Sequence, residues 1–125
     1  MNGTHANCAE VEYAVMLTVL NFQTKFMESH YTGTHLQTYH DLIELTLTRT
    51  APIPAEDRLA ESSEGQALLQ QVHNSLFHAG KHLLQEQLEQ NLGVKIRYLL
   101  SHLDSATGTN VIIVKLAEPL YARSS

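Results

Sequence analysis

The segment from Ser63 to Gly93 limits the possible folds most, because its pattern predicts one long helix. Its apolar residues recur at spacings of three and four, the period of one face of an α-helix. They are Leu69, Val72, Leu76, Ala79, Leu83, Leu84, Leu88 and Leu92. Ser63-Glu64-Gly65-Gln66 has the form of a capping box, and Gly93 suits the left-handed residue after a helix end. Gly80 costs about 1 kcal/mol relative to Ala and indicates a close packing contact in mid-helix.

A β-hairpin is predicted before this helix. In residues 42–50, Ile43, Leu45 and Leu47 alternate with polar residues, which is the period of a half-buried strand. A shorter run over residues 34–39 precedes that strand. His40-Asp41 suits the tight turn between them.

A second hairpin is predicted after the long helix. Residues 94–103 predict a strand with four residues on one face, namely Val94, Ile96, Tyr98 and Leu100. The polar turn 104–109 then leads into a β-branched strand over residues 110–116.

Two further helices are expected from local signals. Residues 9–30 predict a helix in which one face carries Val11, Val15, Val19, Phe22 and Phe26. Asn7 suits its N-cap, and Gly33 ends the segment. Pro54 is predicted to open a short helix through Ala60, because proline fits the first turn of a helix.

The element order predicts the α+β class, because two hairpins occur without any βαβ alternation. We expect an antiparallel sheet of about four strands, formed by the two hairpins, with the N-terminal helix and the long central helix packed on one face. The domain is expected over residues 9–117, between tails at 1–8 and 118–125. Five residues are expected to be buried: Leu45, Leu47, Leu76, Ile96 and Ile113.

Charge and composition exclude several classes of protein. Eight Lys and Arg face 13 Asp and Glu, which gives a net charge of −5 and no basic cluster for a phosphate backbone, so no nucleic-acid partner is expected. One cysteine allows no intramolecular disulfide. The apolar run over residues 15–20 is far short of the roughly 20 residues that span a bilayer. We therefore expect a cytoplasmic protein without direct membrane insertion.

Eight histidines make a metal site the first candidate to consider. His78 and His82 are four residues apart, so on a helix their imidazoles project from one face with a spacing that suits a transition metal. A third ligand would have to come from elsewhere, with His35 and His40 as the candidates. Because the ligand set is incomplete, we expect two surface histidines and no bound metal or cofactor.

No group of residues predicts catalysis. Asp104 and Thr107 could hold a cation, but one carboxylate is too few for a calcium loop and predicts a plain turn. Ser101 and His102 are adjacent in a strand and point to opposite faces, which is unsuitable for proton transfer. We assign no catalytic residues and expect no enzyme.

Several motifs together resemble those of the MpsC-like family. They are Tyr31-Thr32-Gly33, the strand pair from Tyr39 to Thr48, Pro54-Ala55-Glu56, Gly93-Val94-Lys95-Ile96, and the strand–turn segment from Ser101 to Gly108. The resemblance covers residues 11–116. It implies association with a sodium-translocating, membrane-potential-generating system and carries over no catalytic residues.

The expected function is that of a non-enzymatic accessory or regulatory domain that acts through protein contacts. The partner would be a membrane transport subunit, of an ion or inorganic-carbon system, or a second copy in a homodimer. The link to the membrane would then be peripheral and run through that partner. The long helix and the outer sheet edge are the expected contact regions. The alternative is a small-ligand or metal-binding sensor that uses the His78 and His82 face.

Overall fold

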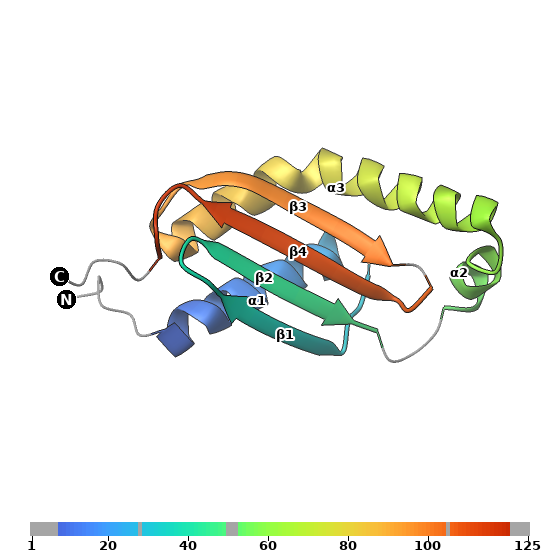
Figure 1. Ribbon diagram of the computed structural model, residues 1–125, viewed down its shortest axis with the longest axis horizontal. Helices are drawn as coiled ribbons and strands as arrows, with labels where there is room; N and C mark the ends of the chain where they lie inside the picture. Colours follow the sequence, from blue (N-terminus) through green and yellow to red (C-terminus); the bar gives the residue numbers. More distant parts are fainter. Residues whose placement is uncertain (1–7, 28, 50–52, 105, 121–125) are drawn as a thin grey trace.

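Seven elements follow one another in the predicted order in a computed structural model, which describes residues 8–27, 29–49, 53–104 and 106–120 (Figure 1). They are α1 (Cys8–Lys25), β1 (Gly33–Thr38), β2 (Leu42–Thr48), α2 (Pro54–Leu59), α3 (Ser63–Leu92), β3 (Ile96–Asp104) and β4 (Thr109–Leu116). Asn7, most of the predicted N-terminal tail and the end of the C-terminal tail lie outside the described residues. The domain boundaries therefore remain a prediction.

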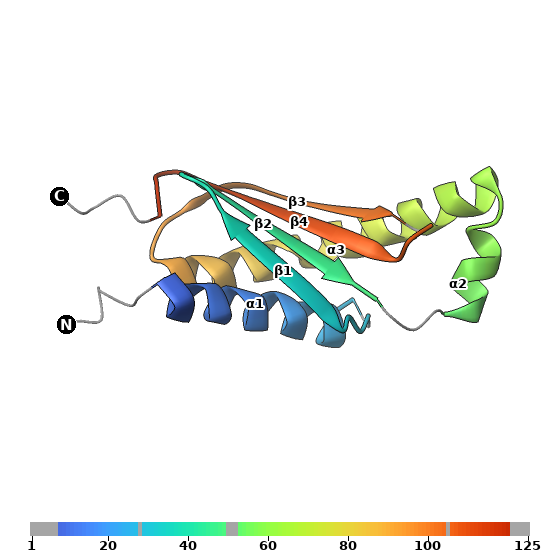
Figure 2. The ribbon, with the colours of Figure 1, turned by 60° about the horizontal axis from the view of Figure 1, so that its bottom comes forward.

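The four strands form one antiparallel sheet in the order β1-β2-β4-β3. Each predicted hairpin supplies two neighbouring strands, and the pairing of β2 with β4 joins the hairpins at the centre. The helices α1 and α3 lie on the same face of this sheet (Figure 2). The predicted α+β class and the one-sided helix layer are confirmed.

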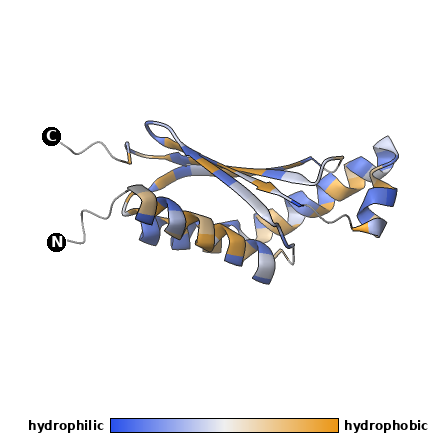
Figure 3. Cartoon of the chain, turned by 90° about the horizontal axis from the view of Figure 1, so that it is seen from below, coloured by the Kyte–Doolittle hydropathy of each residue, from blue (hydrophilic) through white to orange (hydrophobic). Residues whose placement is uncertain are grey.

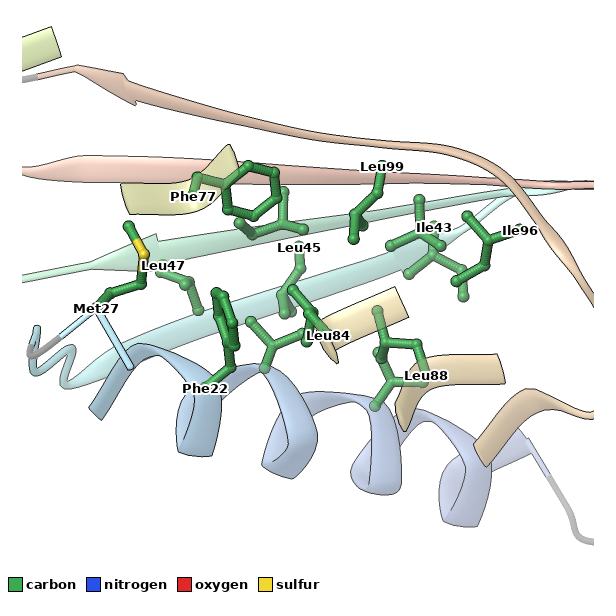
Figure 4. Close-up of a cluster of buried hydrophobic side chains, with 14 of the residues drawn as sticks. Phe22, Met27, Ile43, Leu45, Leu47, Phe77, Leu84, Leu88, Ile96 and Leu99 are labelled. Atoms are coloured by element: carbon green, nitrogen blue, oxygen red, sulfur yellow. The ribbon is translucent and has the colours of Figure 1, made fainter. Parts of the chain in front are cut away.

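The core lies between the sheet and these two helices (Figure 4). The alternation predicted for β2 is confirmed, since Ile43, Leu45 and Leu47 are buried and the residues between them are more exposed. Other strands and helices complete the core with Val15, Val19, Phe22, Met27, Phe77, Leu84, Leu88, Ile96, Leu99, Ile112, Val114 and Leu116.

The face predicted for the third strand is wrong beyond Ile96. The register of β3 against β4 shifts between Ile96 and Tyr98, which is a β-bulge. The extra residue turns the next side chains over, so Leu99 is buried whereas Tyr98 and Leu100 point outward. The predicted burial of Ile113 is also wrong, because β4 directs its neighbours Ile112 and Val114 into the core.

The buried face of α3 also differs from the prediction. Leu76 is 40% exposed, whereas the adjacent Phe77 is buried, together with His73, Leu84 and Leu88. The helix is apolar on two sides, and only one of them can face the sheet. The expected burial of Leu76 is therefore wrong.

Helix α1 is shorter than predicted and ends at Lys25. The backbone N–H groups of Phe26 and Met27 both donate to the Phe22 carbonyl, and the N–H of Ser29 donates to that of Gln23, so the chain leaves the helical path here. This ending leaves the Phe26 ring against α3, where a Cβ on Gly80 would lie 2.5 Å from Phe26 Cε2. The close contact predicted at Gly80 is confirmed.

The ends of α3 follow from local chemistry. The cap is Ser62, one residue before the predicted Ser63, and its side chain accepts from the N–H of Gly65 at 2.9 Å. Gly93 has the predicted left-handed conformation, with φ of 73°. Glu89 then ties the helix to β3, because its carboxylate accepts from the N–H of Ile96 at 2.8 Å.

Replacing Leu84 with alanine should lower the free energy of unfolding by about 2–5 kcal/mol, because its side chain is fully buried and leaves a cavity. Leu17→Ala is the matched control on α1, since Leu17 is 42% exposed and should cost less than about 1 kcal/mol. Urea denaturation of both variants measures the difference. Equal losses would contradict the assigned core.

Candidate functional site

His78 and His82, the candidate metal ligands, are both exposed on α3. His82 Nε2 lies 3.1 Å from Glu86 Oε2, one turn further along the helix. His35 and His40, the suggested third ligands, are exposed in β1 and in the following turn. Among the described residues, no three or more His, Cys, Asp or Glu side chains come close enough to hold a metal ion.

That this protein binds no metal remains a prediction. The purified chain should show no stoichiometric zinc by elemental analysis, because two imidazoles and one exposed carboxylate make a weak site. The control is a His78→Ala, His82→Ala double variant. Stoichiometric zinc in the parent that disappears in this variant would contradict the prediction.

A row of hydrogen-bonded polar side chains crosses the interior between α3 and the β3–β4 hairpin. His73 Nε2 lies 2.8 Å from Ser101 Oγ, and Ser101 Oγ donates to Asn110 Oδ1 at 2.9 Å. Because the Ser101 hydrogen goes to Asn110, Nε2 is the donor in the His73 contact. His73 is 7% exposed and Asn110 is fully buried.

The row continues toward the end of β2 through Tyr31, Arg49 and Glu56. The Arg49 guanidinium lies 5.2 Å from the centroid of the Tyr31 ring and donates to Glu56 Oε1 at 2.8 Å. Burial raises the pKa of Tyr31, and the nearby Arg49 charge and Asn110 amide oppose that shift without cancelling it. The phenol is therefore neutral at physiological pH.

This row is poorly arranged for nucleophilic catalysis. The Ser101 hydroxyl gives its hydrogen to an amide oxygen, so the His73 imidazole does not accept it. Burial lowers the pKa of His73, and the charge of His102 adds to that effect. The sequence analysis placed Ser101 and His102 on opposite faces, and the structure agrees. The sequence analysis did not predict that His73 is buried beside Ser101. The signal was a polar residue four positions before Phe77 on one helical face.

Protonation of His73 should destabilise the fold. Its pKa is lowered in the folded state, so the unfolded chain takes up the proton first, and stability falls as the pH drops through about 6.5. Urea denaturation between about pH 7.5 and 5.5 should show this slope, and His73→Gln should remove it. This pH range lies above the range in which Glu89 and Asp41 titrate, because hydrogen bonds lower the pKa of both carboxyls.

The matched control for this pH dependence is His35→Gln, which changes an exposed histidine on β1. It should leave the slope unchanged. A slope that survives His73→Gln, or disappears in His35→Gln, would contradict the assignment to His73.

An exposed apolar stripe on α3 is the second notable surface. We define the open stripe as Leu68, Val72, Leu76 and Leu83, each of which keeps 40–50% of its surface exposed. The helix carries no Asp, Glu, Lys or Arg from Gly65 to Gly80. A solvent-facing helical stretch of this length without a formal charge is typical of the centre of an interface rather than of a solvated surface.

Two close contacts with the other helices mark the ends of this stretch. A Cβ on Gly65 would overlap the backbone carbonyl of Leu59, so the end of α2 packs directly there. At the other end, Gly80 receives the Phe26 ring beyond the end of α1. Figure 3 shows α3 continuing past α1 with hydrophobic bands. Between Gly65 and Gly80, one flank of the helix stays open.

A groove of about 530 Å³ adjoins the open stripe, between α1 and the second half of α3. Leu83 belongs to both, and Phe26 lies beside it. Most of the remaining lining consists of amides and one cation, including Asn21, Lys25, Gln87 and Asn91. The groove therefore extends the apolar surface and adds hydrogen-bonding groups at its edge.

Comparison with known proteins identifies a family. A family model described as MpsC, Na+-translocating membrane potential-generating system, matches residues 9–118. Neither the curated proteins nor the solved structures include a significant match to the chain. Across the described ranges, no helix is both long and apolar enough to cross a membrane.

Proposed function

Because this chain belongs to the MpsC family, whose description is that of a Na+-translocating membrane potential-generating system, we propose that it is a non-enzymatic accessory domain of such a system. It acts through protein–protein contacts on the cytoplasmic side. The open stripe on α3 is the observation that carries this proposal, since it is an apolar surface that the described residues of the chain leave exposed.

The chemistry of the stripe supports a protein partner. Leucine and valine side chains that are half exposed along one helix gain free energy when another apolar surface removes water from them. The stretch around them carries no formal charge from Asp, Glu, Lys or Arg, so burial there avoids the large desolvation cost of an ionised side chain. A helix of 30 residues also presents the stripe rigidly, because the sheet holds its other face along His73, Phe77 and Leu84.

The charge of the chain favours a protein over lipid as the link to the membrane. A net charge of −5 gives no attraction to an anionic bilayer surface, where Lys and Arg near the headgroups supply that attraction. We therefore assign the membrane link to a subunit of the transport system rather than to the bilayer.

The interior polar row supports a non-enzymatic function. Its only serine–histidine contact directs the hydroxyl hydrogen away from the imidazole, and Arg49 is already paired with Glu56. The alternative of a metal sensor at His78 and His82 gains no support, because the described residues contain no group of three His, Cys, Asp or Glu side chains that could hold a metal ion.

Leu76→Glu should abolish capture of the membrane subunit, because it places a charge at the centre of the open stripe. The parent chain, immobilised on resin, is exposed to detergent-solubilised membranes of the source cell, and retained proteins are identified by mass spectrometry. We expect a membrane transport subunit to be retained by the parent and lost with Leu76→Glu.

Leu17→Glu is the matched control, because Leu17 is a leucine of similar exposure on the outer side of α1. It should retain the subunit as the parent does. Equal retention by Leu76→Glu, or retention of no membrane protein by the parent, would contradict the proposed function. Turnover of a small substrate by the purified chain would contradict its non-enzymatic part.

A further inference from the structure

We propose that Tyr31, Arg49 and Asn110 form a binding site for a small carboxylate anion, and that Glu56 covers the entrance of this site from within the chain. These residues lie where the end of β2, the β3–β4 hairpin and α2 meet, at the end of the sheet beyond which Figure 1 shows α2. The site does not use the open stripe, so the inference is independent of the proposed function.

Two hydrogen-bond donors of this site have no acceptor among the described residues. Asn110 is fully buried, and its Oδ1 accepts from Ser101, but its Nδ2 is unpaired. Arg49 Nε is buried and unpaired as well. Buried donors in folded proteins nearly always have an acceptor, because an unpaired donor has lost its water without compensation. The two N–H groups therefore indicate an acceptor that the described part of the chain does not supply.

The side chains that carry these two donors meet at the Tyr31 phenol. The Arg49 guanidinium lies 5.2 Å from the centroid of the Tyr31 ring. The Asn110 side chain is also close to the phenol, since both it and Arg49 oppose the rise in the Tyr31 pKa that burial causes. That rise prevails, so the phenol keeps its proton at physiological pH and its O–H group is a third donor.

The chemistry of these three groups selects a carboxylate. They offer N–H and O–H donors and one positive charge, and the amide oxygen of Asn110 is already used by Ser101. A water molecule would bring two hydrogens that need acceptors of their own, whereas a carboxylate oxygen accepts several hydrogen bonds and brings none. A guanidinium also fits both oxygens of a carboxylate through two parallel N–H groups.

The contact with Glu56 shows that the Arg49 guanidinium already accepts a carboxylate. Glu56 Oε1 takes one hydrogen bond from Arg49 Nη1, at 2.8 Å, which leaves the Nε–H group unused. The Glu56 side chain is 40% exposed, whereas that of Arg49 is only 11% exposed. Glu56 therefore neutralises the guanidinium from the solvent side and does not satisfy the inner donors.

An incoming carboxylate can replace Glu56 at little cost to the fold. Glu56 belongs to α2, which has six residues, and none of them is buried. The replacement leaves the net charge around Arg49 unchanged, because one carboxylate takes the place of another. It adds hydrogen bonds to the inner donors, which Glu56 does not make. The exchange therefore favours the ligand, and Glu56 returns to water.

The surroundings of Arg49 limit the size of the ligand. The β3–β4 turn covers one side, since a Cβ on Gly108 would lie 3.5 Å from Arg49 Cβ. The Tyr31 ring covers another side. This enclosure favours an anion of the size of formate or acetate over a peptide or a nucleotide.

The test is an NMR titration of the ¹⁵N-labelled full chain with sodium acetate at constant ionic strength. The Arg49 Nε–H and Asn110 Nδ2 signals report directly on the two inner donors. Both should shift and reach saturation, whereas the Nε–H signal of the exposed Arg97 should not. Acetamide has the shape of acetate without its charge and should shift none of these signals.

Three variants, followed through the Asn110 signal, identify the groups involved. Glu56→Gln should bind acetate at least about tenfold more tightly, because Arg49 then has no competing carboxylate. Asp57→Asn is the matched control, because it removes the neighbouring exposed carboxylate of α2, and it should leave the affinity unchanged. Arg49→Lys should bind at least about tenfold more weakly, because lysine keeps the charge but loses the parallel donors. Far-UV circular dichroism checks that each variant is folded.

Three results would overturn the proposal. The first is a parent chain in which acetate causes no saturable shift of the Asn110 signal, so that no carboxylate reaches the inner donors. The second is an equal shift with acetamide, which would exclude selection by charge. The third is a Glu56→Gln variant that binds acetate no more tightly than the parent. None of these results affects the retention of a membrane subunit, which tests the proposed function through the open stripe.

Discussion

The packing of the Phe26 ring on Gly80 decides how much of the long helix this chain can cover. With any side chain at position 80, the Phe26 ring would have to shift away from α3. Helix α1 has 18 residues and α3 has 30, so the shorter helix covers only the second half of the longer one. The sheet holds one face of α3, and the flank beyond Phe26 stays exposed among the residues that the structure describes.

The same arrangement explains why polar side chains occur inside so small a domain. Where α1 ends, the interior between α3 and the β3–β4 hairpin contains His73, Ser101 and Asn110 rather than leucines. Each of these groups loses hydration on folding, and hydrogen bonds along the row offset most of that loss. Asn110 Nδ2 and Arg49 Nε remain without a hydrogen-bond partner among the described residues, so the row is only partly satisfied and is not strongly stabilising.

Membership of the MpsC family and the uncovered flank of α3 together support one mode of action. A small acidic domain with a rigid helix, a neutral apolar stripe and an adjoining amide-lined groove has the features of a binding module. Its interior histidine makes the same helix sensitive to acidification, since protonated His73 is disfavoured where the sheet meets α3. Folding therefore depends on the buried face of α3, and the proposed contact depends on the open flank beside it.

The sequence by itself determined the elements and the class. The alternation of Ile43, Leu45 and Leu47, the Gly93 stop and the absence of βαβ units rest on local chemistry and short periods, which the tertiary structure did not change. The close contact at Gly80 was also predictable, because glycine in mid-helix is less stable than alanine and is favoured where another side chain packs closely against the helix.

Only the tertiary structure decided which of two apolar faces each element buries. Leu76 and Phe77 are both compatible with a helix core, and the sheet selects Phe77 because one helix face can contact one layer. The bulge after Ile96 reverses the side chains of β3, and no local pattern marks it. The open stripe also could not be predicted locally. It depends on where the end of α1 lies against α3, and these two segments are far apart in the sequence.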